Sequence, residues 1–228
     1  MPTLDRDGEV FILNLGAGEN RLNPDWVGGV IDAFDLVERG ESPSALVLSA
    51  EGKFWSTGLD LEWLAANADR ANDFLVDVHE LFARVLECGI PSVAAIQGHC
   101  FAAGAMLALA ADERVMRADR GFFCLPEADI GIPFTPGMND LLVARISQPT
   151  THAAMVGARR YGGSDAVTAG LVDEAVTEDQ VLPVALARAR AQANKDPATR
   201  KKIKQRMYAP ALATLRDREA TVMPAVGG

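Results

Sequence analysis

Apolar positions along the chain form short continuous runs that alternate with longer stretches at helical spacing. Runs of strand length occupy residues 10–15, 45–50, 92–97, 114–117, 121–125 and 171–176. Between them, apolar residues recur every three or four positions over residues 24–38, 71–87, 102–111 and 137–146. Strands separated by helices of this length predict βαβ units with right-handed crossovers. The pattern therefore predicts an α/β fold.

The pattern becomes mostly helical from about Pro149 onward. It includes the run ALARARAQA at residues 185–193 and the basic run RKKIKQR at residues 200–206. We therefore expect a core over residues 1–160 and a mostly helical C-terminal module over residues 161–228. The absence of a linker between them argues against an independent second domain.

Composition narrows the function classes. The 228 residues carry a net charge of −9, which argues against general nucleic-acid binding. No segment reaches the roughly 18 uncharged apolar residues of a membrane span, so we expect no membrane association and a cytoplasmic location. Three cysteines without CxxC spacing argue against a disulfide framework and a zinc site, and no metal is predicted. The basic run at 200–206 fits either a solvated helix face or a local site for a phosphorylated ligand.

Two strand-to-helix turns offer candidate chemistry. The first has a glycine at residue 58, which permits a positive φ, and Asp60 as a plausible helix N-cap. In the second, the small residues 102–105 open an apolar helix whose first N–H groups face open space at the positive end of the helix dipole. Two such turns can direct their N–H groups at one carbonyl oxygen, which predicts an oxyanion hole.

Four segments of the chain resemble the crotonase (enoyl-CoA hydratase/isomerase) superfamily, over roughly residues 8–180. They are LVLSAEGKFWSTGLDL, IPSVAAIQGHCFAAGAMLALAADERV, GFFCLPEADIGIP and MVGARRYGGSDAVTAGLVDEAV. The resemblance implies a core of repeated ββα units arranged as a spiral, followed by a helical C-terminal module. It also implies an acyl-CoA thioester substrate, with coenzyme A as part of the substrate and no separate cofactor. A homotrimer or hexamer assembled through the C-terminal helices is expected by the same resemblance.

The resemblance also assigns roles to single residues. It implies that the backbone N–H groups of Leu59 and Gly104 form the oxyanion hole. Other positions are expected to contact the substrate: Thr57, Gly58 and Asp60 in the first turn, Leu107 and Phe134 at the acyl pocket, and Lys201 and Lys204 at the CoA phosphates.

The acid–base positions indicate the reaction. Hydratases of this family carry two glutamates, and the later one matches Glu127 in the P-E-x-x-x-G motif that ends at Gly131. The earlier position is occupied by Leu107, which cannot activate water. A single carboxylate is similar to the pattern of Δ3,Δ2-enoyl-CoA isomerases. The resemblance therefore implies that Glu127 removes the C2 proton of a 3-enoyl-CoA and returns it at C4. An apolar pocket is expected to raise the pKa of the Glu127 carboxyl.

Alternative functions fit less of the sequence. Enoyl-CoA hydration, another crotonase chemistry or non-catalytic acyl-CoA binding stays open, because a fold does not fix a function. A serine hydrolase would need a G-x-S-x-G elbow around Ser56, which is missing. A dinucleotide-binding fold would need a third glycine after Gly16 and Gly18.

Overall fold

The computed structural model describes residues 1–40 and 44–222. The strands within these residues are β1 (Thr3–Asp7), β2 (Val10–Asn14), β3 (Ala45–Ser49), β4 (Phe54–Ser56), β5 (Ser92–Ile96), β6 (His99–Phe101), β7 (Glu113–Arg117), β8 (Phe123–Cys124) and β9 (Glu174–Val176). The helices are α1 (Pro24–Glu38), α2 (Leu61–Ala66), α3 (Ala71–Glu87), α4 (Ala103–Ala110), α5 (Glu127–Ile130), α6 (Pro136–Arg145), α7 (Gln148–Thr151), α8 (Gly163–Thr168), α9 (Val181–Gln192), α10 (Pro197–Met207) and α11 (Ala209–Leu215), with a π-helical turn η1 (His152–Val156) and a 3₁₀ turn η2 (Glu178–Gln180). Each predicted strand and helix segment contains such an element.

The strands form two sheets. The larger one has the order β1-β2-β3-β5-β7-β9, in which β1 is antiparallel to β2 and the other pairs are parallel. The smaller one has the parallel order β4-β6-β8. Successive repeats give one strand to each sheet and then a helix: β3 and β4 precede α2 and α3, and β5 and β6 precede α4. This arrangement confirms the predicted α/β fold with repeated ββα units.

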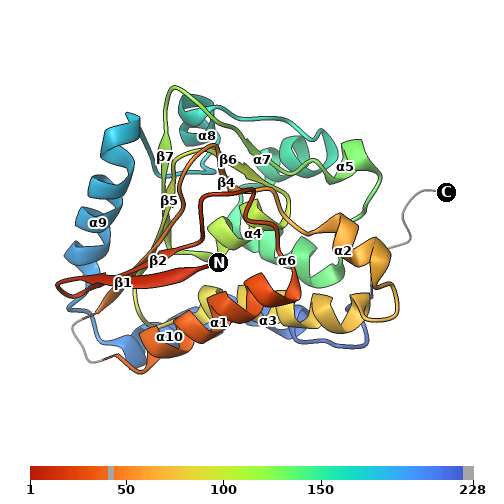
Figure 1. Ribbon diagram of the computed structural model, residues 1–228, viewed down its shortest axis with the longest axis horizontal. Coiled ribbons are helices and arrows are strands. Elements are labelled where there is room, and N and C mark those ends of the chain that lie inside the picture. The colour runs from red at the N-terminus through yellow and green to blue at the C-terminus, as the bar shows by residue number, and fades with distance from the viewer. Residues whose placement is uncertain (41–43, 223–228) are drawn as a thin grey trace.

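The central strands β3 and β5 are buried on both faces because helices cover both sides of the larger sheet. Their side chains alternate between the two faces, as strand geometry requires. Ala45 and Val47 pack with α9, whereas Leu46 and Leu48 pack in the main core with α1, α3 and α4. Figure 1 shows α9 on one side of the sheet and α4 with α6 on the other. Burial of both faces explains why these strands are continuous apolar runs.

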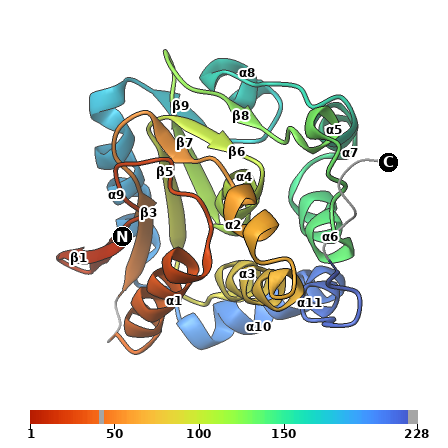
Figure 2. The ribbon, with the colours of Figure 1, turned by 45° about the vertical axis from the view of Figure 1, so that its right-hand side comes forward.

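The C-terminal part of the chain returns to the core. β9 is the last strand of the larger sheet, and α9 packs on the face of that sheet. α10 and α11 lie alongside α3, and α11 also packs against α6 (Figure 2). Residues 161–222 therefore share a core with residues 1–160, and the last part of the predicted module, residues 223–228, lies outside the described residues. None of the described helices has both the length and the apolar character that crossing a membrane requires.

Candidate active site

The first turn begins where β4 ends. Ser56 Oγ donates a hydrogen bond to the Asn20 carbonyl (2.8 Å) and accepts one from Gly58 N–H (3.2 Å). Gly58 has a φ of +93°, and a Cβ on it would lie 2.7 Å from the Cβ of Ala102, so only glycine fits this contact between the two turns. Asp60 accepts a hydrogen bond from Trp63 N–H and begins α2, which confirms the predicted N-cap.

The second turn connects β6 to α4. Its N-cap, Ala102, has φ +50° and ψ −128°, a conformation that costs a non-glycine residue about 1–3 kcal/mol. Gly104 follows in the first turn of α4, where a Cβ would lie 2.5 Å from the Cβ of Ser56. The start of α4 therefore lies directly against the end of β4, and the parallel pairing of β4 with β6 keeps the two turns together.

The backbone N–H groups of Leu59 and Gly104 are both available. In the described part of the chain, neither N–H donates a hydrogen bond to a protein acceptor. Leu59 is bridged to Leu22 through the N–H and C=O groups of its neighbours in sequence, which leaves its own N–H unused. The geometry thus brings together the two residues predicted for an oxyanion hole, and that role stays a prediction.

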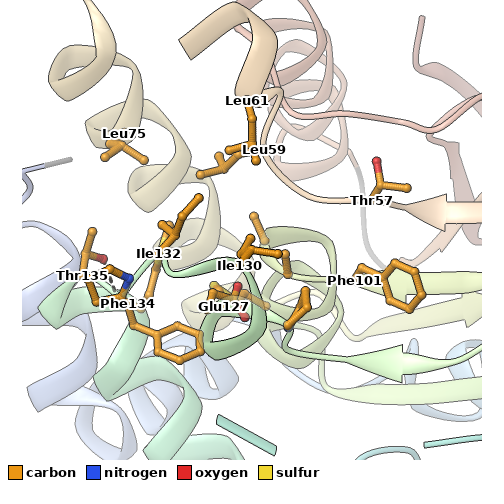
Figure 3. A pocket seen from close by; sticks show the side chains of 16 residues that line it. Thr57, Leu59, Leu61, Leu75, Phe101, Glu127, Ile130, Ile132, Phe134 and Thr135 are labelled. Atoms are coloured by element: carbon orange, nitrogen blue, oxygen red, sulfur yellow. Dashed lines mark hydrogen bonds between the residues drawn. The ribbon is translucent and has the colours of Figure 1, made fainter. Parts of the chain in front are cut away.

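A cavity of about 230 Å³, here called the inner cavity, adjoins both turns. Its walls come from the first turn, the start of α4, α5 and the segment that leads into α6. Figure 3 shows Leu59 and Leu61 on one side of it, and Ile130, Ile132 and Glu127 on the other. The lining is apolar apart from three side chains, namely Thr57, Glu127 and Thr135.

Glu127 is the first residue of α5 and is only 7% exposed. Its Oε2 is buried and has no hydrogen-bond partner among the described residues. Burial raises the pKa of this carboxyl to about 7, against a smaller lowering by a backbone hydrogen bond. A carboxyl with this pKa can accept and release a proton near neutral pH, as a general acid–base residue must.

The two threonine hydroxyls of the inner cavity direct their hydrogens into the protein. Thr57 Oγ1 donates to the carbonyl of Glu19 (3.3 Å). Thr135 Oγ1 caps α6 by accepting from Met138 N–H (3.3 Å) and lies 2.8 Å from His79 Nε2. The direction of this last hydrogen bond depends on the tautomer of His79.

The tautomer of His79 follows from its other neighbour. Thr221 Oγ1 donates to the carbonyl of Asp217 (2.7 Å), so at its 3.2 Å contact with His79 Nδ1 it is the acceptor. Burial lowers the pKa of His79 to about 4, which leaves the ring neutral at pH 7. Nδ1 therefore carries the hydrogen, and Nε2 accepts from the Thr135 hydroxyl. No sequence pattern predicts this row of hydrogen bonds, although Thr135 followed by Pro136 is a helix N-terminus signature.

Of the two predicted acyl-pocket residues, one lines the inner cavity and the other does not. Phe134 lines the inner cavity. Leu107 is fully buried in the core and is not part of the cavity wall, where Met106 lies instead. Because Leu107 stands where hydratases carry a second glutamate, Glu127 is the one carboxylate that lines the cavity among the described residues.

The predicted CoA-contact lysines lie on α10, away from the inner cavity. Lys204 is buried, and its Nζ lies 2.8 Å from Asp112 Oδ1 and donates to the carbonyl of Cys88 (2.9 Å). These contacts tie α10 to the start of β7 and withdraw Lys204 from solvent. Lys201 lies closer to solvent, with its Nζ 3.8 Å from Glu38. The phosphate contact finds no support at Lys204 and stays a prediction for Lys201.

Comparison with known proteins gives the class to which this fold and site belong. The family described as "Enoyl-CoA hydratase/isomerase" matches residues 11–223. The chain therefore belongs to the enoyl-CoA hydratase/isomerase family, the crotonase superfamily. Members of this family act on acyl-CoA thioesters and typically form oligomers.

Individual relatives include both isomerases and hydratases. The chain is similar to enoyl-CoA delta isomerase 3 of Arabidopsis thaliana, with 33% identity over 77% of this chain and 76% of the relative. It is also similar to hydroxycinnamoyl-CoA hydratase-lyase of Pseudomonas fluorescens, with 26% identity over 84% of this chain and 71% of the relative. A solved protein of Mycobacterium tuberculosis, described in one structure as an enoyl-CoA isomerase and in another as a probable enoyl-CoA hydratase, is also similar. The first of these structures superposes with a TM-score of 0.87 at 27% identity, over 95% of this chain and 95% of that chain.

Proposed function

We propose that the protein is an enoyl-CoA isomerase that converts a 3-enoyl-CoA to a 2-enoyl-CoA. The observation that carries this proposal concerns the residues that the structure describes. Among them, Glu127 is the one carboxylate in the apolar inner cavity, its Oε2 is buried without a partner, and the two neighbouring N–H groups donate to no protein acceptor. The similarity to an Arabidopsis enoyl-CoA delta isomerase supports the same reaction.

The reaction needs one base, one acid and one charge-stabilising group. Deprotonated Glu127 removes a proton from C2 of the substrate, and the electrons move onto the thioester oxygen to form a dienolate. The N–H groups of Leu59 and Gly104 stabilise this oxygen, and each such donor contributes about 3–4 kcal/mol in comparable sites. Electrons then return from the oxygen, the double bond forms between C2 and C3, and C4 takes the proton from Glu127. Glu127 ends the cycle deprotonated, as it began.

Hydration is the second candidate, because a hydratase-lyase is also among the relatives. Adding water across a double bond requires a group that holds and deprotonates the water and a second group that protonates carbon. In the inner cavity, the Thr57 and Thr135 hydroxyls donate to protein acceptors, so Glu127 would have to supply both functions. This distribution of polar groups favours isomerisation. The predicted homotrimer or hexamer and the predicted cytoplasmic location stay predictions.

The test offers the purified protein a 3-enoyl-CoA and, separately, a 2-enoyl-CoA. Double-bond migration is followed by the absorbance of the conjugated thioester, and water addition by chromatographic detection of 3-hydroxyacyl-CoA. We expect isomerisation to exceed hydration by orders of magnitude. Faster hydration would overturn the proposal, and binding without either reaction would identify a non-catalytic acyl-CoA-binding protein.

A further inference from the structure

The segment of residues 19–23, between β2 and α1, runs alongside the first turn. Leu22 N–H donates to the Gly58 carbonyl (2.8 Å), and Asp60 N–H donates to the Leu22 carbonyl (2.9 Å). These two hydrogen bonds fix the residues on either side of Leu59 and leave the Leu59 N–H unused. All residues of the segment are described and none of them lines the inner cavity, so the segment influences the cavity only through the residues that it holds.

Asn20 connects this segment to β4. It is buried, and its side-chain Nδ2 donates to the carbonyls of Trp55 (3.0 Å), Phe54 (3.3 Å) and Gly16 (3.2 Å). An amide nitrogen carries two hydrogens, so three acceptors occupy both of them. The backbone carbonyl of Asn20 accepts from Ser56 Oγ (2.8 Å). Asn20 therefore makes a hydrogen bond to every residue of β4.

Ser56, which Asn20 holds, contacts both turns of the candidate site. Its Oγ accepts from Gly58 N–H (3.2 Å), and a Cβ added to Gly104 would lie 2.5 Å from its Cβ. Asn20 makes its contacts with a backbone φ of +49°, and Ala102 in the second turn has a φ of +50°. Such conformations are unfavourable for residues other than glycine and persist where the surrounding contacts require them, which is common at functional sites.

We propose that Asn20 is a positioning residue for the oxyanion hole. Its side-chain amide and its backbone carbonyl fix β4, and with it the direction of the Leu59 N–H and its distance from the Gly104 N–H. Such donors stabilise a developing oxyanion when they are held in place beforehand, and a misplacement of about 1 Å can lower a rate about 100-fold. The role of Asn20 rests on the proposed function, because it takes these two N–H groups as those that bind the thioester oxygen.

The test replaces Asn20 in two ways. Asn20→Gly keeps a residue that readily adopts the positive φ and removes the amide. Asn20→Asp keeps the shape of the side chain and puts a second acceptor where the donor stood. Val37→Ala is the matched control, because Val37 is fully buried at the far end of α1 from Asn20 and its truncation also lowers the free energy of unfolding. Circular dichroism and urea titrations measure the folding of each variant.

Two measurements report on the oxyanion hole. The first is kcat and KM on a 3-enoyl-CoA, and the second is the infrared stretching frequency of an isotope-labelled thioester carbonyl in bound butanoyl-CoA, which falls when N–H donors polarise the carbonyl. We expect the Asn20 variants to lower kcat by about tenfold or more, to change KM by less than about threefold and to reduce the carbonyl shift. Val37→Ala should leave all three unchanged. A folded Asn20 variant with normal kcat and a normal carbonyl shift would overturn the proposal, as would equal losses in Val37→Ala.

The infrared measurement needs no turnover and so separates the role of Asn20 from the proposed function. A carbonyl shift that is present in the unmodified protein and lost in the Asn20 variants, in a protein that isomerises no substrate, would retain the positioning role and reject the isomerase. Isomerisation at unchanged kcat in the Asn20 variants, with the carbonyl shift retained, would retain the isomerase and reject the positioning role.

Discussion

Two glutamates in this protein have the same small exposed fraction, and their carboxyl pKa values are shifted in opposite directions. Glu87 and Glu127 are each 7% exposed. Glu87 accepts hydrogen bonds from Arg216 (2.9 Å) and Gln205 (3.0 Å). Its burial would raise the pKa of this carboxyl, but the hydrogen bonds and the charge of Arg216 outweigh burial and lower it. At Glu127 burial is opposed only by the smaller effect of a backbone hydrogen bond, and the pKa rises to about 7.

The difference teaches that burial alone does not identify a catalytic carboxylate. Glu87 is at the end of α3, where it joins that helix to the C-terminal segment through Arg216. Within residues 1–40 and 44–222, no cation forms an ion pair with Glu127, and its Oε2 has no hydrogen-bond partner where the carboxyl faces the apolar inner cavity. The same side chain with the same exposed fraction thus stabilises the fold in one place and is left available for proton transfer in the other.

The largest expected effect is on turnover. Glu127→Gln keeps the size of the side chain and removes the base, so the rate of isomerisation should fall by about 100-fold to 10,000-fold while acyl-CoA binding persists. Glu87→Gln is the matched control and should keep most of the activity. The measurement is kcat on a 3-enoyl-CoA for the two variants. Near-normal kcat in Glu127→Gln would show that another group is the base.

The next largest effect is on the free energy of unfolding, which should depend on pH through Glu127. As pH rises from about 4.5 to 7, Glu127 loses its proton in the unfolded chain before it does so in the folded chain. The free energy of unfolding should therefore fall over this range by about 3 kcal/mol on account of this group. In Glu127→Gln this contribution is absent. In urea titrations, the free energy of unfolding of the variant should therefore rise relative to that of the unmodified protein between pH 4.5 and 7.5. A constant difference between the two proteins at all pH values would contradict the raised pKa.

A smaller effect of opposite sign is expected at Glu87. Glu87→Gln leaves Arg216 with weaker partners and should lower the free energy of unfolding by about 1–3 kcal/mol at pH 7. Because the pKa of Glu87 is lowered in the folded state, its stabilisation is present above its unfolded pKa and is lost as pH falls. The difference between the variant and the unmodified protein should therefore shrink in acid. Urea titrations at pH 7 and pH 3.5 check this, and a difference that grows in acid would refute it.

The smallest effect is the pH dependence of the reaction itself. With a pKa of about 7, roughly a tenth of Glu127 is deprotonated at pH 6 and nine tenths at pH 8. We expect kcat/KM to rise about tenfold between these values and then to level off. A profile that is already flat between pH 5 and 8 would indicate a base with an ordinary carboxyl pKa.

Much of the fold could be predicted because its signals are local. α1 has its predicted bounds, since Asn23 caps it and Pro24 opens it. β3 and β5 were predictable as apolar runs because helices cover both faces of the sheet. β4 and β6 were not predicted, because strands of three residues are too short to show a period.

In the candidate site, too, local features could be predicted from the sequence and contacts between distant residues could not. A motif located Glu127, but the absence of a partner for its Oε2 depends on residues that come from distant parts of the chain. The pairing of Lys204 with Asp112 likewise joins residues far apart in sequence, and a basic run alone does not distinguish a buried ion pair from a solvated face. The chain from Thr135 through His79 to Thr221 joins three separate segments, so sequence spacing could not indicate it.

The contact between Ser56 and Gly104 has a consequence for how this sequence can evolve. Any side chain at position 104 collides with the Cβ of Ser56, and removing that Cβ would require glycine at position 56. Glycine there would lose the hydroxyl that binds Asn20 and Gly58 and so shapes the neighbouring turn. Neither residue can therefore be replaced first without disrupting the turn. Drift in descendants of this chain should therefore leave the pair unchanged while the surrounding residues of the inner cavity vary.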